Sequence, residues 1–299
     1  MTLRIVAAHA IGGALRLQSL AEQVFGAQHR DAQWFARKLH RELVDDTLSM
    51  VAVDGDDLDD PRAWLGYVLV GRPPSCAPAA RTAGTAVIAP ARGRGVATAL
   101  LEAAARTCAD AGLRSLQLWA EQARESFYCA RGFELQMRFS TMLAFARGPA
   151  APWPGPLPWR PPDEPALQLL PHGFLPEAWE RTPAHERATW SLTSPLARVH
   201  VAREARAFAV HGVWLADLRD AARVLDAVLT RLPTDAPVVA VALAEPDASP
   251  AHATASSSEQ EDEQEDAAAV SSITAPTVAR LRRLGWLDAQ RGAILQRRL

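Results

Sequence analysis

Glycine and arginine alternate in the segment RGRGVA, residues 92–97, which lies between an apolar stretch ending at Pro90 and an amphipathic stretch beginning at Ala97. Glycine lets the backbone approach a ligand without a clash from Cβ. A turn that leads into a helix also brings free backbone N–H groups together at the positive end of the helix dipole. Because these groups attract anions, and because arginine adds charge and paired hydrogen bonds, the segment predicts a phosphate-binding turn.

The turn by itself does not identify its ligand. A flexible loop with solvated arginines has the same composition, and that interpretation stays open at this point. A Walker A loop is excluded because no Gly-Lys-Ser/Thr follows. A dinucleotide-binding fingerprint is disfavoured because a third glycine is missing and the preceding strand is the fourth or fifth of its half-chain rather than the first. The segment therefore indicates an anion, and a second motif is needed to name it.

A second motif follows about 30 residues downstream. The stretch SLQLWA, residues 115–120, predicts a strand, and ESFYCARGF, residues 125–133, predicts a short helix followed by Gly-Phe. The two segments together resemble the GNAT superfamily of acetyl-CoA-dependent N-acetyltransferases. That family has a strand, Arg/Gln-x-x-Gly-x-Gly/Ala and a helix, and then a strand, a short helix with a tyrosine, and Gly-Phe opening a hairpin. Tyr128 stands five residues before Phe133, as in the family.

The resemblance implies a site for acetyl-CoA in which backbone N–H groups hold the pyrophosphate. The residues that would supply this cradle are Arg92, Gly93, Arg94, Gly95, Val96, Ala97 and Thr98. The backbone of Val87 and Ile88 would bind the pantetheine arm, and the thioester would lie near Trp119, where two parallel strands separate. Tyr128 would protonate the leaving CoA thiolate after direct attack by an amine, with no covalent enzyme intermediate. The alternative is that Tyr128 packs in the core and its hydroxyl is hydrogen-bonded there.

Two positions depart from the family pattern. A single residue separates Pro90 from Arg92, where the family usually has two. Glu121 follows the next strand, where the family commonly has asparagine. Since the attacking amine must lose a proton, Glu121 is a candidate general base, and a solvated glutamate at a strand end is the alternative. Glu125 and His40 are weaker candidates.

Alternating strands and helices in the first half of the chain must position these side chains. Hydrophobic patterns and turn residues predict strands at Leu3–Ala8, Thr47–Val53, Trp64–Val70, Thr85–Ile88, Ser115–Ala120 and, as a strand pair or hairpin, Phe133–Phe145. Apolar residues three and four apart predict helices over Leu17–Phe25, Phe35–Leu43, Ala97–Cys108 and Arg124–Ala130. The fold class is therefore mixed α/β, which the resemblance refines to a GNAT-like mixed central sheet flanked by helices.

Proline-rich and acidic stretches divide the chain. Residues 149–165 have a proline density that neither a helix nor an interior strand tolerates, which predicts a linker between domains at 1–148 and 166–299. Residues 253–272 contain the run SSSEQEDEQED and predict a disordered acidic loop. The second half repeats the order strand, helix, strand, helix, Gly-aromatic and strand.

This repeat suggests a degenerate second copy of the GNAT fold, as in tandem GNAT enzymes such as the mycothiol synthases. Trp214–Arg223 contains no glycine, so the phosphate cradle is missing there, and Leu281 occupies the place of Tyr128. We expect this copy to be structural, covering an edge or face of the first domain and walling its acceptor pocket. An unrelated α/β domain is the alternative.

Composition narrows the partners and the compartment. A formal net charge of −2 and a pI near 6.5 give no electrostatic footprint for nucleic acid or for an anionic membrane. Three cysteines without C-x-x-C spacing disfavour a disulfide framework and a zinc knuckle, and the scattered histidines imply no metal. With neither a signal peptide nor a long apolar window, we expect a cytoplasmic protein.

The predicted function is an N-acetyltransferase that transfers the acetyl group of acetyl-CoA directly to a primary amine of a small molecule or peptide. One alternative is a non-catalytic sensor that binds acyl-CoA as a regulatory ligand. Another is a protein-modifying acetyltransferase whose second domain docks the target. These motifs do not encode the acceptor, the acyl chain length or the oligomeric state, for which a homodimer is one option.

Overall fold

The computed structural model describes residues 2–26, 32–149, 154–163, 167–168, 176–193, 195–204, 207–234, 238–244 and 276–299. The predicted acidic loop, residues 253–272, lies outside these ranges, as do residues 150–153 and 164–165 of the predicted linker. The chain forms two compact units. The first comprises Met1–Trp119, Ser126–Glu134 and Leu295–Leu299, and the second comprises Ala120–Glu125 and Leu135–Ile294. These units interleave along the chain, whereas the predicted domain limits follow the linker and stay a prediction.

The first unit is built on a mixed sheet. Its strands, in spatial order, are β1 (Leu3–Ala7), β2 (Met50–Asp54), β3 (Trp64–Gly71), β4 (Ala79–Val87) and β5 (Ser115–Glu121), followed by the C-terminal end of β12 (Leu287–Arg298). Neighbours from β1 to β4 are antiparallel, and β4 and β5 are parallel. A parallel pair needs a crossover, which α3 (Val96–Asp110) supplies. The mixed sheet predicted from the sequence is confirmed.

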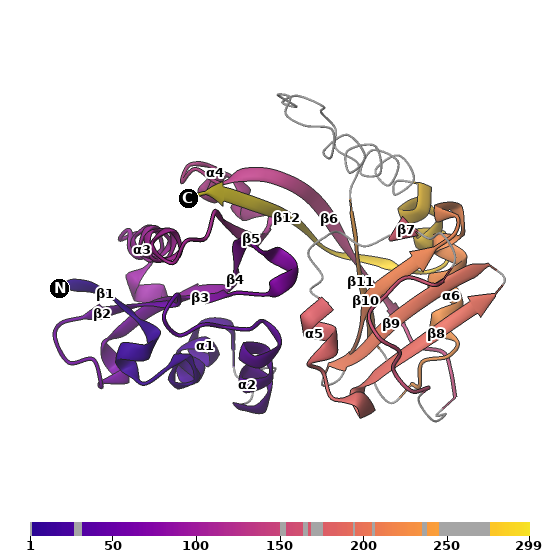
Figure 1. Cartoon of the computed structure of the whole chain (residues 1–299), viewed down its shortest axis with the longest axis horizontal. Helices are drawn as coiled ribbons and strands as arrows, with labels where there is room; N and C mark the ends of the chain where they lie inside the picture. The colour runs from indigo at the N-terminus through magenta and orange to yellow at the C-terminus, as the bar shows by residue number, and fades with distance from the viewer. Residues whose placement is uncertain are drawn as a thin grey trace. The chain divides into compact units, whose positions relative to one another are not determined.

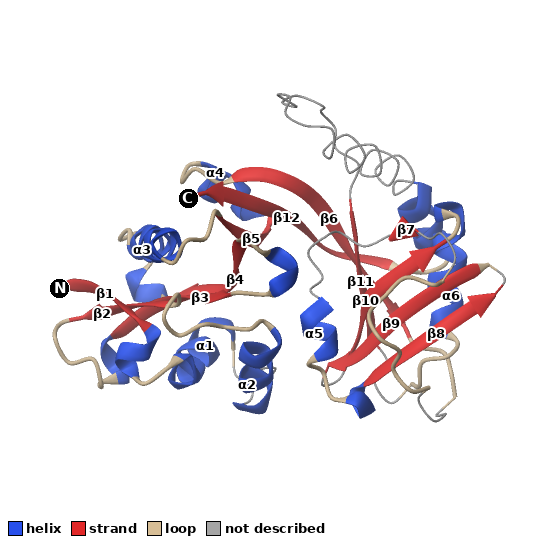
Figure 2. Cartoon of the chain, in the orientation of Figure 1, coloured by secondary structure: helices blue, strands red, loops and turns tan. Residues whose placement is uncertain are grey.

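Helices cover both faces of this sheet, as Figures 1 and 2 show. On one face, α1 (Gln18–Phe25) and α2 (Ala32–Arg41) pack their apolar residues against alternate residues of β2, β3 and β4. On the other face lies α3, whose buried stripe includes Leu100, Leu101, Ala104 and Cys108. This stripe has the spacing of three and four residues that the sequence displays, so the helix is predicted correctly.

The last residues of the chain complete the first unit. The Arg297 guanidinium donates two hydrogen bonds to the Glu102 carboxylate of α3, at 2.6 and 3.0 Å. The Gln117 side-chain amide donates to Gln296 at 3.1 Å, and the Leu299 N–H donates to the Arg114 carbonyl at 3.0 Å. The final strand, which the sequence assigns to the repeat in the second half, therefore contributes its end to the first unit.

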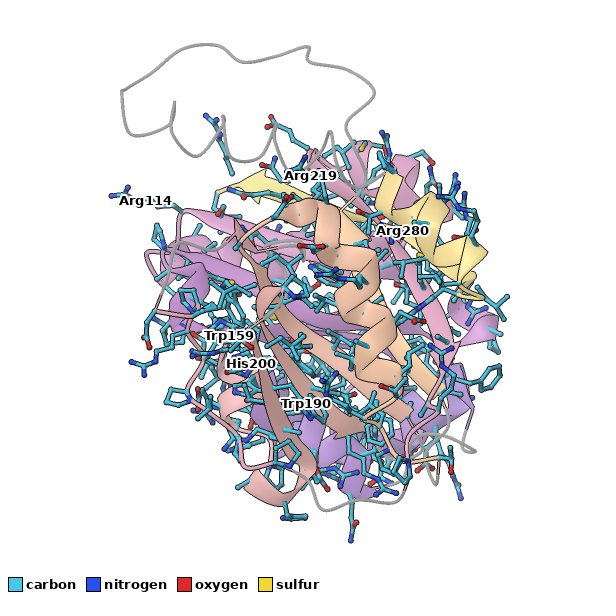
Figure 3. All side chains as sticks on the ribbon, turned by 90° about the vertical axis from the view of Figure 1, so that its right-hand side faces the viewer. Arg114, Trp159, Trp190, His200, Arg219 and Arg280 are labelled. Carbon is cyan, nitrogen blue, oxygen red and sulfur yellow. The ribbon has the colours of Figure 1, made fainter. Side chains whose placement is uncertain are left out.

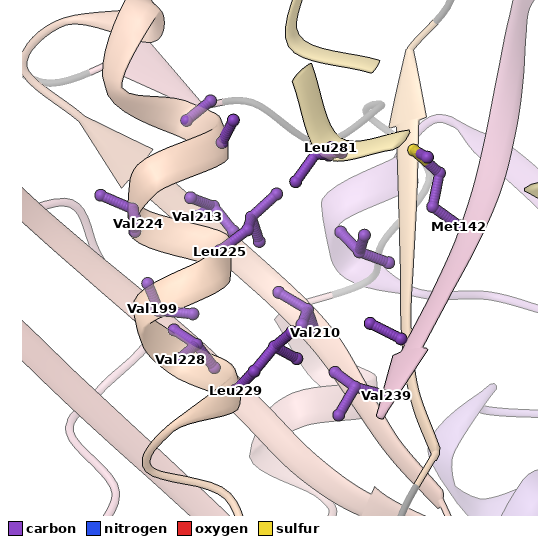
Figure 4. Packing of buried hydrophobic residues seen from close by; sticks show 14 of the residues in the cluster. Met142, Val199, Val210, Val213, Val224, Leu225, Val228, Leu229, Val239 and Leu281 are labelled. Carbon is purple, nitrogen blue, oxygen red and sulfur yellow. The ribbon is translucent and has the colours of Figure 1, made fainter. Parts of the chain in front are cut away.

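The second unit repeats the arrangement. From the N-terminal part of β12, its strands follow in the order β6 (Glu134–Phe145), β11 (Val238–Ala244), β10 (Ala207–Leu215), β9 (Leu196–Glu204) and β8 (Arg187–Thr193). The strands β10 and β11 are parallel, and α6 (Ala221–Leu229) connects them as α3 connects β4 and β5. Figure 4 shows the core that α6 forms, in which Met142 and Leu281 also lie.

The remaining elements are short. They are α4 (Glu125–Cys129), α5 (Pro176–Glu180), β7 (Leu167–Gln168), a helix over residues 276–283, and 3-10 turns that include η6 (Ala89–Ala91), η7 (Gln122–Arg124) and η9 (Leu218–Asp220). No described helix is long and apolar enough to cross a membrane.

Two predicted elements differ from the structure, and two further strands were not predicted. Phe133–Phe145, predicted as a strand pair or hairpin, is the single strand β6, which pairs without interruption with β11 over Phe139–Phe145. The strand predicted at Thr85–Ile88 is β4, which begins at Ala79. The prediction missed this start because its alanine-rich residues have weak strand propensity. The strands β8 and β9 were not predicted.

A buried aromatic cluster lies on strands of the second unit. His200 is fully buried, and its ring centre lies 5.3, 4.6 and 5.0 Å from the ring centres of Trp159, Trp179 and Trp214. Figure 3 labels His200 and Trp159 of this cluster. Burial, together with the neighbouring Arg198 charge, lowers the pKa of His200 to about 3, so the ring is neutral at physiological pH. Among the described residues, no group of three or more His, Cys, Asp and Glu could hold a metal ion.

The Arg297–Glu102 pair yields a stability prediction. Replacing Arg297 by alanine should lower the free energy of unfolding at neutral pH by about 0.5–1 kcal/mol, since the pair is partly exposed. The hydrogen bond from Arg297 lowers the pKa of Glu102. Stabilisation by the pair is therefore present above the carboxyl's unfolded pKa and is lost as the pH falls through its folded pKa.

The exposed neighbour Arg298 provides the control. Urea unfolding of the Arg297→Ala and Arg298→Ala variants should show a difference at neutral pH that shrinks in acid. A difference of equal size at all pH values would contradict an ionised Glu102 partner.

Candidate acyl-CoA site

The strands β4 and β5 separate inside the first unit. Their parallel ladder joins Ala79–Arg81 to Ser115–Gln117 and does not continue through the described residues beyond. The β3–β4 register shifts directly afterwards, between Leu69 and Val70, and Gly84 has a φ of +145°. Such a bulge bends its strand and increases the local twist. The bulge in β4 therefore accounts for the opening between the two strands, which was predicted near Trp119.

The far end of β4 presents backbone groups to this opening. The Ile88 N–H donates to the Leu65 carbonyl of β3 at 2.9 Å. Because antiparallel residues alternate between bonded and non-bonded pairs, the N–H and C=O of Val87 and Thr85 point away from β3. The Val87 carbonyl accepts a hydrogen bond from Arg92 Nε at 3.0 Å. The Val87 backbone therefore faces away from β3, while Ile88 uses its N–H within the sheet, and pantetheine binding by either residue stays a prediction.

The predicted phosphate cradle lies at the N-terminus of α3. The turn η6 leads into Gly93 and Gly95, whose φ angles are +74° and +79°. Gly95 is the N-cap residue, so it makes no side-chain capping bond, and the first turn of α3 carries no acidic residue. A Cβ placed at either glycine would meet no atom within 4 Å. The outward N–H groups and the open space fit a phosphate group.

Tyr128 lies on α4, held by its neighbours in the chain. Its ring meets Phe127 edge-on at 5.1 Å and Phe133 edge-on at 5.9 Å. Its carbonyl accepts hydrogen bonds from the N–H groups of Arg131 and Phe133, at 2.8 and 3.3 Å. The positive φ of Gly132, +76°, lets the chain fold back in this way. The Gly-Phe motif therefore fixes the backbone that carries Tyr128.

A side chain that the sequence did not single out connects the two motifs. Arg131 Nε donates to the Thr98 hydroxyl in the first turn of α3 at 2.8 Å, and its Nη1 donates to the Phe127 carbonyl at 2.5 Å. Its guanidinium carbon lies 3.6 Å from the centre of the Phe127 ring. The sequence signal that could have identified Arg131 is its position immediately before the Gly-Phe motif.

Comparison with known proteins agrees with this geometry. Residues 15–133 match the acetyltransferase (GNAT) family. The chain contains a GNAT acetyltransferase domain. No curated protein sequence matches the chain.

Solved GNAT structures resemble the whole chain in fold. A GCN5-related N-acetyltransferase from Sphaerobacter thermophilus has a TM-score of 0.57 at 12% identity, covering 99% of this chain and 95% of that one. A tandem GNAT protein from the clavulanic acid biosynthesis pathway has a TM-score of 0.54 at 14% identity, covering 99% and 98%. At such low identity these likenesses show the fold alone.

The candidate general bases of the GNAT domain are less well placed. Glu121 is exposed at the end of β5, and His40 is exposed near the end of α2. Glu125 accepts two hydrogen bonds from Arg138, at 3.1 and 2.6 Å. Glu121 and Glu125 belong to the second compact unit, whereas the cradle and Tyr128 belong to the first. The general base stays a prediction.

A stacked pair marks the point where β4 and β5 part in the GNAT domain. The Arg81 guanidinium carbon lies 4.8 Å from the centre of the Trp119 ring, and Arg81 is buried. The pKa of Arg81 is lowered overall, because the effect of burial exceeds the opposing effect of the nearby Glu42 carboxylate. The closed end of the opening is therefore both aromatic and charged.

The cradle predicts an anion site that can be tested without a substrate. Inorganic pyrophosphate should raise the melting temperature of the full-length protein, because a ligand that binds the native state stabilises it. Gly95→Val should remove this shift, since a side chain at a φ of +79° forces the turn to move.

Gly112, near the other end of α3, gives a matched control. It also has a positive φ, +76°, and open space around its Cβ position. Gly112→Val should carry a similar strain of about 1–2 kcal/mol and keep the pyrophosphate shift. Equal shifts in both variants would place the anion elsewhere.

Proposed function

We propose that the protein is an N-acetyltransferase that transfers the acetyl group of acetyl-CoA to a primary amine of a small molecule or peptide. The uncapped N-terminus of α3 carries this proposal, because it offers N–H groups to a pyrophosphate beside the open edge of β4. The GNAT family match supports acetyl transfer in general.

Acetyl-CoA supplies a thioester whose carbonyl carbon an unprotonated amine attacks, forming a C–N bond as the C–S bond breaks. Backbone N–H groups at the opening between β4 and β5 would stabilise the negative charge that develops on the carbonyl oxygen. Tyr128 would give its hydroxyl proton to the departing thiolate. The proton lost by the amine would pass to Glu121 or to water.

The second copy of the fold is proposed to lack a CoA site. Where α3 begins with glycine, the turn before α6 contains Asp217, whose carboxylate accepts from the Arg219 N–H at 2.9 Å, and Asp220 is the N-cap residue of α6. These acidic groups disfavour a phosphate. Leu281, in the place of Tyr128, is fully buried in the core. This copy would serve a structural role.

The compartment is proposed to be the cytoplasm. The three cysteines are free, and burial raises the pKa of Cys108 to about 11, which keeps this thiol protonated. The acceptor is proposed to be an amine rather than a nucleic acid or a membrane lipid, as the near-neutral net charge indicates.

The proposal of one working site predicts the binding stoichiometry. Isothermal titration with CoA should give one CoA per chain for the wild type, and Gly95→Val should leave no binding. Gly112→Val should keep one CoA per chain. A second equivalent, or binding that survives in Gly95→Val, would show that the second copy also binds CoA.

Transfer itself is tested with a panel of primary amines and acetyl-CoA, with thiol release as the readout. At least one amine should accelerate thiol release, and Tyr128→Phe should lower kcat by about 100-fold or more while keeping the acetyl-CoA melting shift. Unchanged turnover in Tyr128→Phe would remove the proposed proton donor. A melting shift without thiol release for any amine would favour the sensor.

A further inference from the structure

Arg131 bridges two elements that are distant in the sequence. Its Nε donates a hydrogen bond to the Thr98 hydroxyl of α3. Its Nη1 donates to the Phe127 carbonyl of α4, and its guanidinium group lies over the Phe127 ring. Thr98 lies 33 residues before Arg131, and these three residues belong to the same compact unit. One side chain thus connects the phosphate cradle to the helix that carries Tyr128.

The direction of the hydrogen bond matters for the cradle. A hydroxyl group has one proton to donate and two lone pairs that accept. Since Arg131 Nε occupies a lone pair of Thr98 Oγ1, the Thr98 proton stays available to another acceptor. A charged donor also polarises the hydroxyl and strengthens the bond that it donates. A phosphate held at the first turn of α3 is an acceptor suited to this proton.

The same arginine confines Tyr128. Two contacts from Arg131 hold Phe127, and the Phe127 ring meets the Tyr128 ring edge-on at an interplanar angle of 85°. The backbone N–H of Arg131 also donates to the Tyr128 carbonyl at 2.8 Å. Movement of the Arg131 side chain would release both the ring beside Tyr128 and the first turn of α3.

A neighbouring carboxylate is bound mainly by another arginine. Glu102 lies one turn after Thr98 on α3, and its two oxygens accept two hydrogen bonds from Arg297, while the Arg131 charge adds to the lowering of its pKa. Arg131 directs Nε to Thr98 and Nη1 to Phe127.

We propose that Arg131 is a positioning residue that couples the phosphate cradle to Tyr128, so that occupancy of the cradle fixes the tyrosine for proton donation. This inference rests on the proposed acetyl transfer. Arg131 touches neither the acetyl group nor the amine, and acts through Thr98 on one side and Phe127 on the other.

The first test is a double-mutant cycle in the full-length protein, with acetyl-CoA and an amine that the wild type acetylates. Arg131→Ala should lower kcat by about 10- to 100-fold, as expected for a misplaced catalytic group, and change KM for the amine little. In a Tyr128→Phe background the same substitution should lower kcat less than twofold. Arg114→Ala, an exposed arginine of the same unit, serves as the control and should keep the wild-type kcat.

Thr98 supplies a second pair of variants that preserves the fold. Thr98→Val keeps the shape but removes the hydroxyl, and should lower kcat and weaken the acetyl-CoA melting shift. Thr98→Ser restores the hydroxyl and should restore both. Adding Thr98→Val to Arg131→Ala should weaken the melting shift no further.

The outcomes separate this inference from the function beneath it. A wild type that neither shifts with acetyl-CoA nor releases thiol overturns the proposed acetyl transfer. A working wild type in which Arg131→Ala behaves like Arg114→Ala overturns the coupling alone. The coupling is also overturned if Arg131→Ala costs the same factor in kcat with and without the Tyr128 hydroxyl, because Arg131 would then act on the whole unit.

Discussion

The first turn of α3 points backbone N–H groups outward with no side-chain cap to accept from them. Such groups need water, a cap or a ligand as a partner, and in the proposed function that partner is the pyrophosphate of acetyl-CoA. Two glycines with positive φ hold this arrangement, the bulge in β4 opens the sheet beside it, and Arg131 ties α4 to it. The chemistry proposed for Tyr128 depends on the same helix end.

Sequence reasoning succeeded where the determinants are local. The segment at 92–97 and the helix after it could be predicted because glycine conformation and helical periodicity are read from adjacent residues. The opening between β4 and β5 depends on strand register, and the Arg131–Thr98 bond joins two motifs across 33 residues. The long strand β6 was mistaken for a hairpin because pairing partners, and not composition, decide its length.

The two units share one arrangement of strands and helix, and the proposal that only one of them binds CoA depends on the start of that helix. Both contain a parallel strand pair joined by a helix, with an apolar core on the helical side. At the start of that helix one unit has glycine and the other has aspartate. Core packing tolerates either residue, because the turn lies at the helix end, whereas anion binding depends on it. Similarity of fold therefore carries no information about the number of working sites.

The C-terminal strand has a consequence for synthesis of the protein. Glu102 pairs with Arg297, 195 residues later in the chain, so the first unit stays incomplete until Arg297 has been translated. At about 5–20 residues per second, the nascent chain would wait roughly 10–40 seconds with the edge of β5 unpaired. An unpaired strand edge can pair with strands of other chains and so promote aggregation. The first unit thus assembles only once β12 has been translated, and a fragment ending at the linker would lack the strand that neighbours β5.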